Sequence, residues 1–541
     1  MKRILISVLM AALLMVSCGD TAEPAESESV TETQTVTDLT LSGKIALTGE
    51  NLLLCVEGHE SIAVEGFRKM RDLWLFLPAG VDAEKVRLTV LNENGAQGES
   101  MTVNLRESVI SLTVSDGTEL AVEWQQSSLP GIFIHLDEGD EGFAAVEASE
   151  KKLIEAEGRL TVSDLQIENA KMTLGGRGNW TWIQDKKGYS LKFSAKTSIL
   201  GMAEAKSWVL LANKADTALM RNMVAYDLAK QLGMPYTPDC IPCELYVNGE
   251  YRGSYQIAEK TEIGKNRIDI ADMEKETEVI SGSDIGQTGR ETLDCGANIR
   301  YAKNVLSPSD VSGGYLLEFE LADRYSAEPC GFQTKRGFYF VIKSPEYASR
   351  EQVVYIAELY QKIENALFKN DPALWEMLDM ESAVKKYLLE EIIKNFDANH
   401  SSQYFHKNAG NSLVCFGPMW DLDAAFGNTE ATVDPNGRYA ALNGWWKALR
   451  AREDFTAEAK RVWEETLRPI CMKMIEEGIP AYEEALASSA AMNFIRWDHL
   501  GVKPPLSTYI PTGNTYAESV EQLRSYFKAR IEWMDGFVDR Y

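Results

Sequence analysis

The chain has 541 residues, which is too long for one hydrophobic core, so two or three domains are expected. Its composition is typical of a globular protein, with 45% apolar and 25% charged residues. The net charge of −26 argues against a broad nucleic-acid interface or a surface that binds anionic lipid, since both require dense Lys and Arg.

The N-terminus has the features of a targeting segment. Lys2 and Arg3 precede a short apolar run over 4–16, which is too short for an ordinary transmembrane helix. Ser17-Cys18 then resembles the lipobox of bacterial lipoproteins. We expect cleavage of a signal peptide over 1–17, lipidation of Cys18 and export to the cell envelope, with membrane contact only through this anchor. A plain secretory signal with an incidental cysteine is the alternative.

Two further segments precede the main part of the chain. Residues 18–38 are rich in Glu, Thr, Ser and Ala and cannot bury enough surface to order, which predicts a disordered tether. Residues 39–128 contain short β-like runs separated by turn residues such as Asn94-Gly95, which predicts a small all-β sandwich. Nothing in this sandwich has a catalytic pattern, so a spacer or binding role is its default.

A longer unit over 129–541 begins with mostly β-like sequence. The Asn248-Gly249 pair between two such runs is the strongest short-range signal for a type I′ hairpin. A helix is predicted from Asp216 or Thr217 to Gly233, because apolar residues recur there on one helical face. The polar, Gly- and Ser-rich stretch 263–312 is predicted to be a partly mobile insertion.

Helices are predicted to dominate from Arg350 onward. Val384, Leu388, Ile392 and Phe396 form one helical stripe, so Asp397 is expected just past the end of that helix. The sequence therefore predicts an α+β architecture with a β-rich lobe before an α-rich lobe. A two-lobed enzyme binds its ligand in the cleft between the lobes.

Two acidic stretches in the α-rich part have the layout of a phosphoryl-transfer centre. The first runs over 395–400 and contains Asp397, and the second runs over 417–428 and contains Asp421 and Asp423. One aspartate could orient a nucleophile while a second acidic element holds Mg²⁺, with substrate phosphates as the remaining ligands. Paired acidic motifs also arise by chance in so acidic a chain.

Other kinds of catalytic site are disfavoured because their motifs are missing. The five histidines show no metal-ligand spacing such as H-E-x-x-H, and the chain has neither a G-x-S-x-G elbow nor a P-loop. Cys240 and Cys243 form a C-x-x-C in strand-like sequence, which favours a structural disulfide or two buried thiols over a redox site. No second C-x-x-C completes a zinc site.

Three basic residues are candidates for binding phosphate. Arg177 belongs to a glycine-rich segment over 175–178 whose backbone N–H groups could approach phosphate, although most such segments simply turn the chain. Lys192 lies in a predicted strand after that segment, where spacing alone favours a solvated lysine on an edge strand. Arg221 follows Asp216 near a helix start, where capping and ion pairing explain the residues as well as a site does.

Eight motifs follow one another in order from residue 175 to residue 428, within a similarity that covers about residues 129–450. They are G-G-R-G-N-W-T-W, K-K-G-Y-S-L-K-F, W-V-L-L-A-N-K-A-D-T-A-L-M-R-N, L-Y-V-N-G-E-Y-R-G-S-Y-Q-I-A-E-K, G-G-Y-L-L-E-F-E, I-K-S-P-E, N-F-D-A-N-H and G-P-M-W-D-L-D-A-A-F-G-N. This series resembles the CotH kinase family, which is named for a bacterial spore-coat protein. The tether and the predicted sandwich lie outside the match.

The resemblance implies an atypical, protein-kinase-like bilobal fold and Mg-dependent transfer of the ATP γ-phosphoryl group to Ser or Thr residues of a protein. Asp397 would be the catalytic aspartate. Asp421 is the first choice as a metal ligand, and Asp423 is close behind it. Lys192 would bind phosphate, assisted by Arg177 or Arg221. The sequence does not identify the protein substrate.

The resemblance also implies a carboxamide ligand for a second Mg²⁺. The family often shows Asn before an aromatic pair, but this chain has Gln403 before Tyr404-Phe405. Gln403 or Asn399 is therefore a candidate metal ligand. Glu318, in the strand predicted after Gly313-Gly314, is a further candidate for binding the cofactor.

Two other functions are compatible with the sequence. ATP is scarce outside the cytoplasmic membrane, so an exported chain of this kind could be a cell-surface binding or adhesion protein on an inactive kinase-like scaffold. A third alternative retains nucleotide binding but transfers another group to protein side chains. The three aspartates favour an enzyme, because a pure binding protein has no need of aligned carboxylates.

Overall fold

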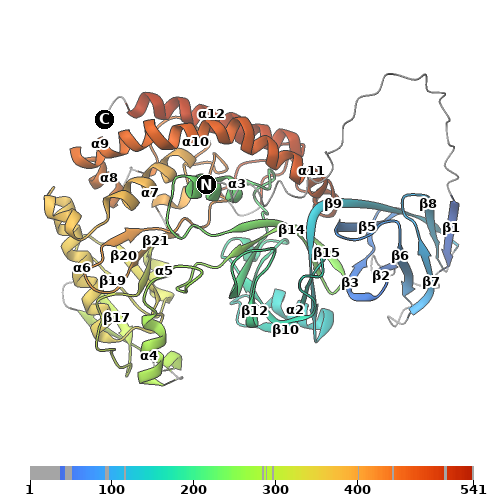
Figure 1. Cartoon of the computed structure of the whole chain (residues 1–541), viewed down its shortest axis with the longest axis horizontal. Helices are drawn as coiled ribbons and strands as arrows, with labels where there is room; N and C mark the ends of the chain where they lie inside the picture. Colours follow the sequence, from blue (N-terminus) through green and yellow to red (C-terminus); the bar gives the residue numbers. More distant parts are fainter. Residues whose placement is uncertain are drawn as a thin grey trace, which may run out of the picture. The chain divides into compact units, whose positions relative to one another are not determined.

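The computed structural model describes residues 37–42, 52–91, 97–114, 117–282, 285–287, 289–294, 298–399, 401–440, 444–504 and 508–538 (Figure 1). The chain divides into two units, 1–37 and 38–541, and nearly all described residues belong to the second. The predicted signal peptide, Cys18 and almost all of the predicted tether lie outside the described residues. Within the described part, no helix is both long and apolar enough to cross a bilayer.

Two sheets share one core in the first part of the second unit. One has the strand order β3-β2-β6-β7, and the other is formed by β1, β8, β4, β5 and the first half of β9. Alternating apolar residues from both sheets, such as Leu54 and Leu75, are fully buried in this core. The bounds are β1 Thr37–Ser42, β2 Leu52–Val56, β3 His59–Glu65, β4 Phe67–Lys69, β5 Asp72–Ala79, β6 Val86–Leu91, β7 Gln97–Val103 and β8 Ser108–Thr113.

Seven strands close into a barrel next in the chain. The second half of β9 (Glu119–Leu136) pairs with β10 on one side and, in parallel, with β14 on the other, and the ring continues as β10-β11-β12-β13-β15-β14. Inward-facing residues such as Ile134, Leu191 and Trp208 form a separate core, which α2 (Gly139–Ala148) completes. The bounds are β10 Glu155–Val162, β11 Ala170–Arg177, β12 Gly188–Thr197, β13 Ala205–Leu211, β14 Cys240–Val247 and β15 Glu250–Glu259.

Strand β9 runs without interruption through the predicted domain boundary between residues 128 and 129. Up to Pro130 it pairs with β5 and β8, and after Pro130 it pairs with β10 and β14. Proline has no N–H to donate, so it fits the residue at which a strand changes partners. The two-sheet part and the barrel are therefore linked by one continuous strand.

The predicted hairpin between β14 and β15 is confirmed. Asn248 and Gly249 have φ values of 50° and 95°, the two positive angles that a type I′ turn requires. Cys240 and Cys243 lie on β14 as free thiols. Burial raises the pKa of Cys240 to about 12, so very little of this thiol is ionised to the reactive thiolate at neutral pH.

A further sheet, separate from those above, has seven strands in the order β16-β17-β19-β20-β18-β21-β22. Its first two strands lie in the stretch predicted to be an insertion, where the structure also places α4. Strands β18 and β21 are antiparallel neighbours and carry several candidate residues. The bounds are α4 Met273–Ser281, β16 Arg290–Asp294, β17 Asn298–Ala302, β18 Tyr315–Glu320, α5 Ala322–Ala327, β19 Gly331–Gln333, β20 Tyr339–Ser344, β21 Gln403–Lys407 and β22 Val414–Phe416.

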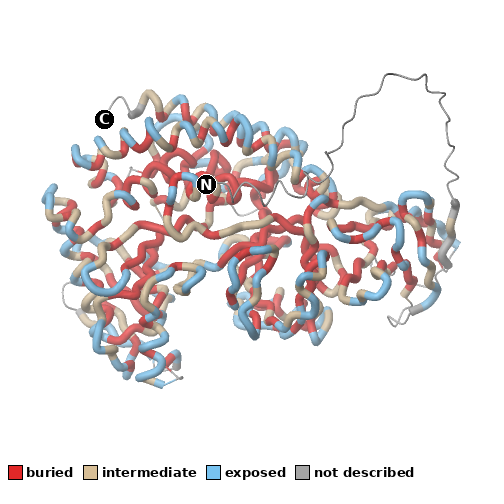
Figure 2. The backbone as a smooth tube through the Cα atoms, in the orientation of Figure 1, coloured by how far each residue is buried: buried red, intermediate tan, exposed pale blue. Residues whose placement is uncertain are grey.

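Helices dominate from Arg350 onward, as predicted, and the fold is of the α+β type. The largest core lies among these helices, α3 and the seven-stranded sheet. Helix α7 is buried along most of its length (Figure 2). The bounds are α3 Arg221–Gln231, α6 Arg350–Phe368, α7 Met380–Ile393, α8 Gly444–Arg450, α9 Glu453–Val462, α10 Arg468–Lys473, α11 Ile479–Arg496 and α12 Tyr516–Val538.

Candidate active site

Main-chain hydrogen bonds join the two acidic stretches. The N–H of Phe426 donates to the carbonyl of Ile393 at 2.7 Å, and the N–H of Phe396 donates to the carbonyl of Ala424 at 3.4 Å. Helix α7 ends just before the first stretch because Lys394 adopts a left-handed conformation. The aspartates of the two stretches are therefore close in space.

Asp397, Asp421 and Asp423 form what we call the acidic group, and all three are half-buried. Burial, followed by the charges of Asp421 and Asp423, raises the pKa of Asp397 well above its usual range. Burial, followed by the charge of Asp421, raises the pKa of Asp423 to about 7. Carboxylates so close together favour either a bound proton or a cation among them.

Tyr509 contacts the acidic group from a distant part of the chain. Its hydroxyl donates to Asp423 Oδ2 at 2.9 Å, which opposes the rise in the pKa of that carboxyl. The Tyr509 ring lies 4.6 Å from the ring of Trp180, centroid to centroid. No sequence motif points to Tyr509, since it lies 86 residues from Asp423 and outside every motif.

Two asparagine side chains hold the backbone of the second stretch. Asn222 Oδ1 accepts from the N–H of Leu422 at 2.9 Å, and Asn428 Nδ2 donates to the carbonyl of Asp423 at 2.9 Å. Asp421, which directly precedes Leu422, has a φ of 59°, which is uncommon for a residue other than glycine. These amides stabilise an unusual backbone at the residue expected to bind metal.

Arg221 is paired with Asp216 at the start of α3. The Asp216 carboxylate accepts from the Arg221 guanidinium and from the backbone N–H groups of Ala218 and Arg221, the latter at 2.7 Å. Both side chains are buried. The positive charge of Arg221 is therefore balanced by Asp216, whose own negative charge helps to raise the pKa of Asp423.

Arg177 contacts the second acidic stretch through Trp420. Its guanidinium carbon lies 5.3 Å from the centre of the Trp420 ring, next to Asp421 in sequence. The charges of Arg177 and Asp421 both act on the pKa of Tyr404, in opposite directions. Arg324, which sequence analysis did not select, lowers the pKa of Asp397.

Lys192 lies on the outer surface of the barrel and is exposed. Leu191 and Phe193 on either side belong to the barrel core, so Lys192 points outward. Thr173 lies opposite Lys192, and Arg177 follows four residues along β11, so Arg177 and Lys192 share one face. Four residues of strand span roughly 13 Å, so the backbone of Arg177 lies about that far along the strand from the level of Lys192.

Glu318 lies at the edge of the acidic group. Burial is the main cause of its raised pKa, and the Asp421 charge adds to it. Lys343 Nζ at 3.7 Å and a hydrogen bond from Tyr404 act in the opposite direction. Lys343 belongs to the I-K-S-P-E motif, which is the signal through which it could have been selected.

Gln403 and Asn399 line a small cavity rather than joining Glu318. Side chains alternate along a strand, so Gln403 points to the opposite side of β21 from Tyr404. The cavity has a volume of about 120 Å³, and most of its walls are aromatic. Asn399 Nδ2 donates to the carbonyl of Tyr439 at 2.7 Å.

The donor atoms of the acidic group suit a hard cation. Within the described residues, no cluster of three or more His, Cys, Asp or Glu side chains is placed to hold a metal ion. A Mg²⁺ site that also uses substrate phosphates needs only one or two carboxylates, which Asp421 and Asp423 supply. The raised pKa of Asp423 fits a position where a cation relieves repulsion between carboxylates.

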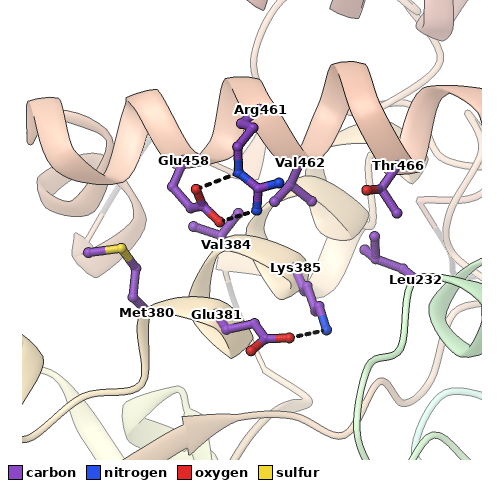
Figure 3. Close-up of a pocket in the computed structure, with 9 residues that line it drawn as sticks. All are labelled: Leu232, Met380, Glu381, Val384, Lys385, Glu458, Arg461, Val462 and Thr466. Atoms are coloured by element: carbon purple, nitrogen blue, oxygen red, sulfur yellow. Dashed lines mark hydrogen bonds and ion pairs between the residues drawn. The ribbon is translucent and has the colours of Figure 1, made fainter.

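A cavity of about 490 Å³ lies at the other end of α7 from Asp397 (Figure 3). Its charged side chains are paired with one another, Lys385 with Glu381 and Arg461 with Glu458. Such pairs leave little net charge to attract a charged ligand. This cavity is therefore a weaker candidate for the active site than the acidic group.

Comparison with known proteins identifies one family. The sequence model of the family described as CotH kinase protein matches residues 174–534. The match begins within β11 and includes the acidic group, Arg177 and Tyr509. No curated protein matches the chain.

Proposed function

Because the chain belongs to the CotH kinase family, we propose that it is an ATP-dependent protein kinase. The γ-phosphoryl group is transferred to a Ser or Thr hydroxyl of a protein substrate, and the barrel serves as the β-rich lobe of a kinase-like bilobal fold. The observation that carries this proposal is the junction of the two acidic stretches. A phosphoryl-transfer centre needs one acid at the nucleophile and others at the metal.

In the proposed reaction, Asp397 orients the acceptor hydroxyl and takes up its proton. The bond from the hydroxyl oxygen to the γ-phosphorus forms as the bond to the β–γ bridging oxygen breaks. The raised pKa of Asp397 suits proton acceptance. Asp421 and Asp423 would hold Mg²⁺, which when bound would neutralise phosphate charge.

The other candidate residues have supporting roles in this proposal. Arg177 and Lys192 contact phosphate oxygens from one face of the barrel, and Arg177 is the nearer to Trp420. Arg221 has no direct contact with phosphate in this proposal, because its positive charge is balanced by the ion pair with Asp216. Glu318 positions Tyr404 beside Asp421. Gln403 and Asn399 both line the aromatic cavity, and Asn399 donates to the carbonyl of Tyr439, so we assign the carboxamide ligand to neither residue.

Transfer from labelled ATP tests the proposal directly. The full chain is incubated with [γ-³²P]ATP, Mg²⁺ and a general acceptor such as casein, and incorporation is compared with that of Asp397→Asn. We expect a loss of roughly 10²-fold or more, because the variant cannot accept the hydroxyl proton. Asp434→Asn, at an exposed aspartate, is the matched control. Equal incorporation by wild type and Asp397→Asn would remove Asp397 from this role.

A binding protein on an inactive scaffold is the second candidate. It is favoured by the pairing of Arg221 with Asp216, which leaves fewer free cations for phosphate. Calorimetric titration with ATP and Mg²⁺ separates the two functions, with an Asp421→Asn/Asp423→Asn variant as comparison. A kinase binds nucleotide in a Mg-dependent way that this variant loses, and absence of binding at millimolar nucleotide contradicts the kinase proposal.

We also propose that the chain is exported and anchored to the membrane through Cys18. The support is the charged and apolar sequence before Ser17-Cys18. In a bacterial host, the full chain is expected in the membrane fraction and Cys18→Ser in the soluble fraction. Equal membrane association of both forms would contradict lipid attachment at Cys18.

A further inference from the structure

The cavity lined by Gln403, which we call the Gln403 cavity, is a small aromatic chamber beside the acidic group. It has a volume of about 120 Å³. Phe340, Phe405 and Trp445 form buried walls, with ring centroids 5.4 Å apart for Phe340–Trp445 and 6.0 Å for Phe405–Trp445. Phe319 and Phe338 also line it and are only half-buried, so the cavity has an accessible side.

Two residues that line this chamber have buried polar atoms without a partner among the residues that the structure describes. Gln403 is 3% exposed, and neither its amide oxygen nor its amide nitrogen has a hydrogen-bond partner in the described part of the chain. The indole N–H of Trp445 is also buried and has no hydrogen-bond partner among the described residues. Gln403 and Phe405 lie two residues apart on β21 and both line the cavity, so the Gln403 amide faces it. Buried polar groups are normally satisfied, which indicates that something binds here.

We propose that the Gln403 cavity binds a neutral, single-ring aromatic group that carries a carboxamide. An apolar cavity of comparable volume holds one benzene ring. A carboxamide both donates and accepts, which complements the Gln403 amide, and the Trp445 N–H supplies a second donor to its oxygen. None of the described lining residues is charged, so an ionised ligand would lose its hydration without gaining a partner.

The cavity is coupled to the acidic group through the chain itself. Ala398 and Asn399 line the cavity and directly follow Asp397. Asn399 is in turn held by the carbonyl of Tyr439. A ligand in the cavity therefore contacts the turn that carries Asp397, and its binding restricts the movement of that turn.

Binding of benzamide to the full chain tests the proposal. Affinity is measured by ligand-observed NMR, without nucleotide or Mg²⁺, for wild type, Gln403→Leu and Trp445→Phe. We expect Gln403→Leu to weaken benzamide binding about tenfold and Trp445→Phe to weaken it several-fold, because each removes hydrogen bonds to the head group. Gln361→Leu, on α6 and outside the cavity lining, is the matched control and should bind as wild type does.

Two further probes separate the ring from its head group. Toluene has the ring without the carboxamide, and Gln403→Leu should bind it at least as well as wild type does. Benzoate is charged and should bind much more weakly than benzamide.

Three results would overturn the proposal. The first is no benzamide binding at millimolar concentration, as expected for a chamber filled only by ordered water. The second is equal benzamide affinity for wild type and Gln403→Leu, and the third is benzoate binding as tight as that of benzamide. Circular dichroism establishes folding of each variant, and Gln403→Met replaces Gln403→Leu if the latter is unfolded. Because no ATP is present, these results are independent of phosphoryl transfer.

Discussion

Asp423 links the charge of the acidic group to the stability of the fold. Its pKa is about 7 in the folded chain and about 3.9 when unfolded, so the folded chain binds the proton more tightly. The stabilisation from this group is therefore complete below about pH 4 and is lost as the pH rises toward 7. Any cation bound among the carboxylates acts against that loss.

We expect the free energy of unfolding of metal-free protein to fall by roughly 1–2 kcal/mol between pH 4 and 7 through Asp423, after allowance for coupling to Asp421. Urea denaturation at several pH values measures the free energy of unfolding of wild type and of Asp423→Asn. The quantity compared is the slope of that free energy against pH, for wild type minus the variant. The variant should show the flatter dependence. Identical slopes would mean that the pKa of Asp423 is not raised.

Tyr509→Phe should shift the pH dependence of Mg²⁺ binding to higher pH. The Tyr509 hydroxyl lowers the pKa of Asp423, so its removal raises that pKa further and leaves less carboxylate at pH 7. Mg²⁺ affinity, followed by calorimetry, is expected to drop several-fold at pH 7 and to recover at higher pH. Tyr301→Phe, at a residue away from the acidic group, should leave the profile unchanged.

The three aspartates could be selected from sequence because each lies in a compact local motif. Their surroundings could not be selected in this way. Tyr509 and Asn222 reach the second stretch from segments that only the folded backbone brings together. For Arg221 the sequence left ion pairing and phosphate binding equally open, and the structure shows the ion pair with Asp216.

Helix α11 is attached to the barrel through a buried polar cluster. Lys186 Nζ donates to the carbonyl of Ser254 at 2.7 Å and to Asn493 Oδ1 at 2.8 Å. Asn493 Oδ1 also accepts from the N–H of Ser254 at 3.1 Å. Burial lowers the pKa of Lys186 well below its usual range, so the cluster matters as a set of hydrogen bonds.

Asn493→Leu should therefore destabilise the chain by about 3 kcal/mol, because it leaves the Lys186 amine and the Ser254 N–H buried without their partner. The free energy of unfolding from urea denaturation measures this. Glu484→Ala, at an exposed position on the same helix, should change it by no more than about 0.5 kcal/mol. Similar values for both variants would contradict a structural role for the cluster.

Local patterns predicted the elements that depend on local interactions. The stripe containing Val384 and Leu388 corresponds to α7, and Asn248-Gly249 forms the expected turn. The continuity of β9 was not predictable in this way, because the sequence pattern indicated a domain boundary between residues 128 and 129, inside this strand. An exchange of strand partners depends on pairing between distant segments, which no short window of sequence contains.

The two-sheet part and the barrel are joined by side chains as well as by β9. The Tyr246 hydroxyl donates to the carbonyl of Phe76 at 2.8 Å, and the rings of Phe76 and Tyr251 have centroids 4.8 Å apart. Phe133 and Tyr246, from barrel strands, are buried in the core of the two-sheet part. The two parts therefore depend on each other for the burial of apolar surface.

We expect a single heat-capacity peak for the folded part of the chain. Phe76→Ala should lower the free energy of unfolding by about 3–5 kcal/mol and shift that whole peak to lower temperature. Differential scanning calorimetry measures both. Two separate peaks, of which the variant shifts only one, would instead support independent folding of the predicted 39–128 domain.

The closed barrel restricts where this protein can change shape. A ring of seven paired strands has no free edge, so it cannot spread without breaking hydrogen bonds. Arg177, at the end of β11, is therefore carried by a rigid frame. The two acidic stretches are joined to each other by two main-chain bonds, and the amides of Asn222 and Asn428 hold the second stretch. If the chain closes around a substrate, we therefore expect the acidic segments and their helices to move relative to the barrel.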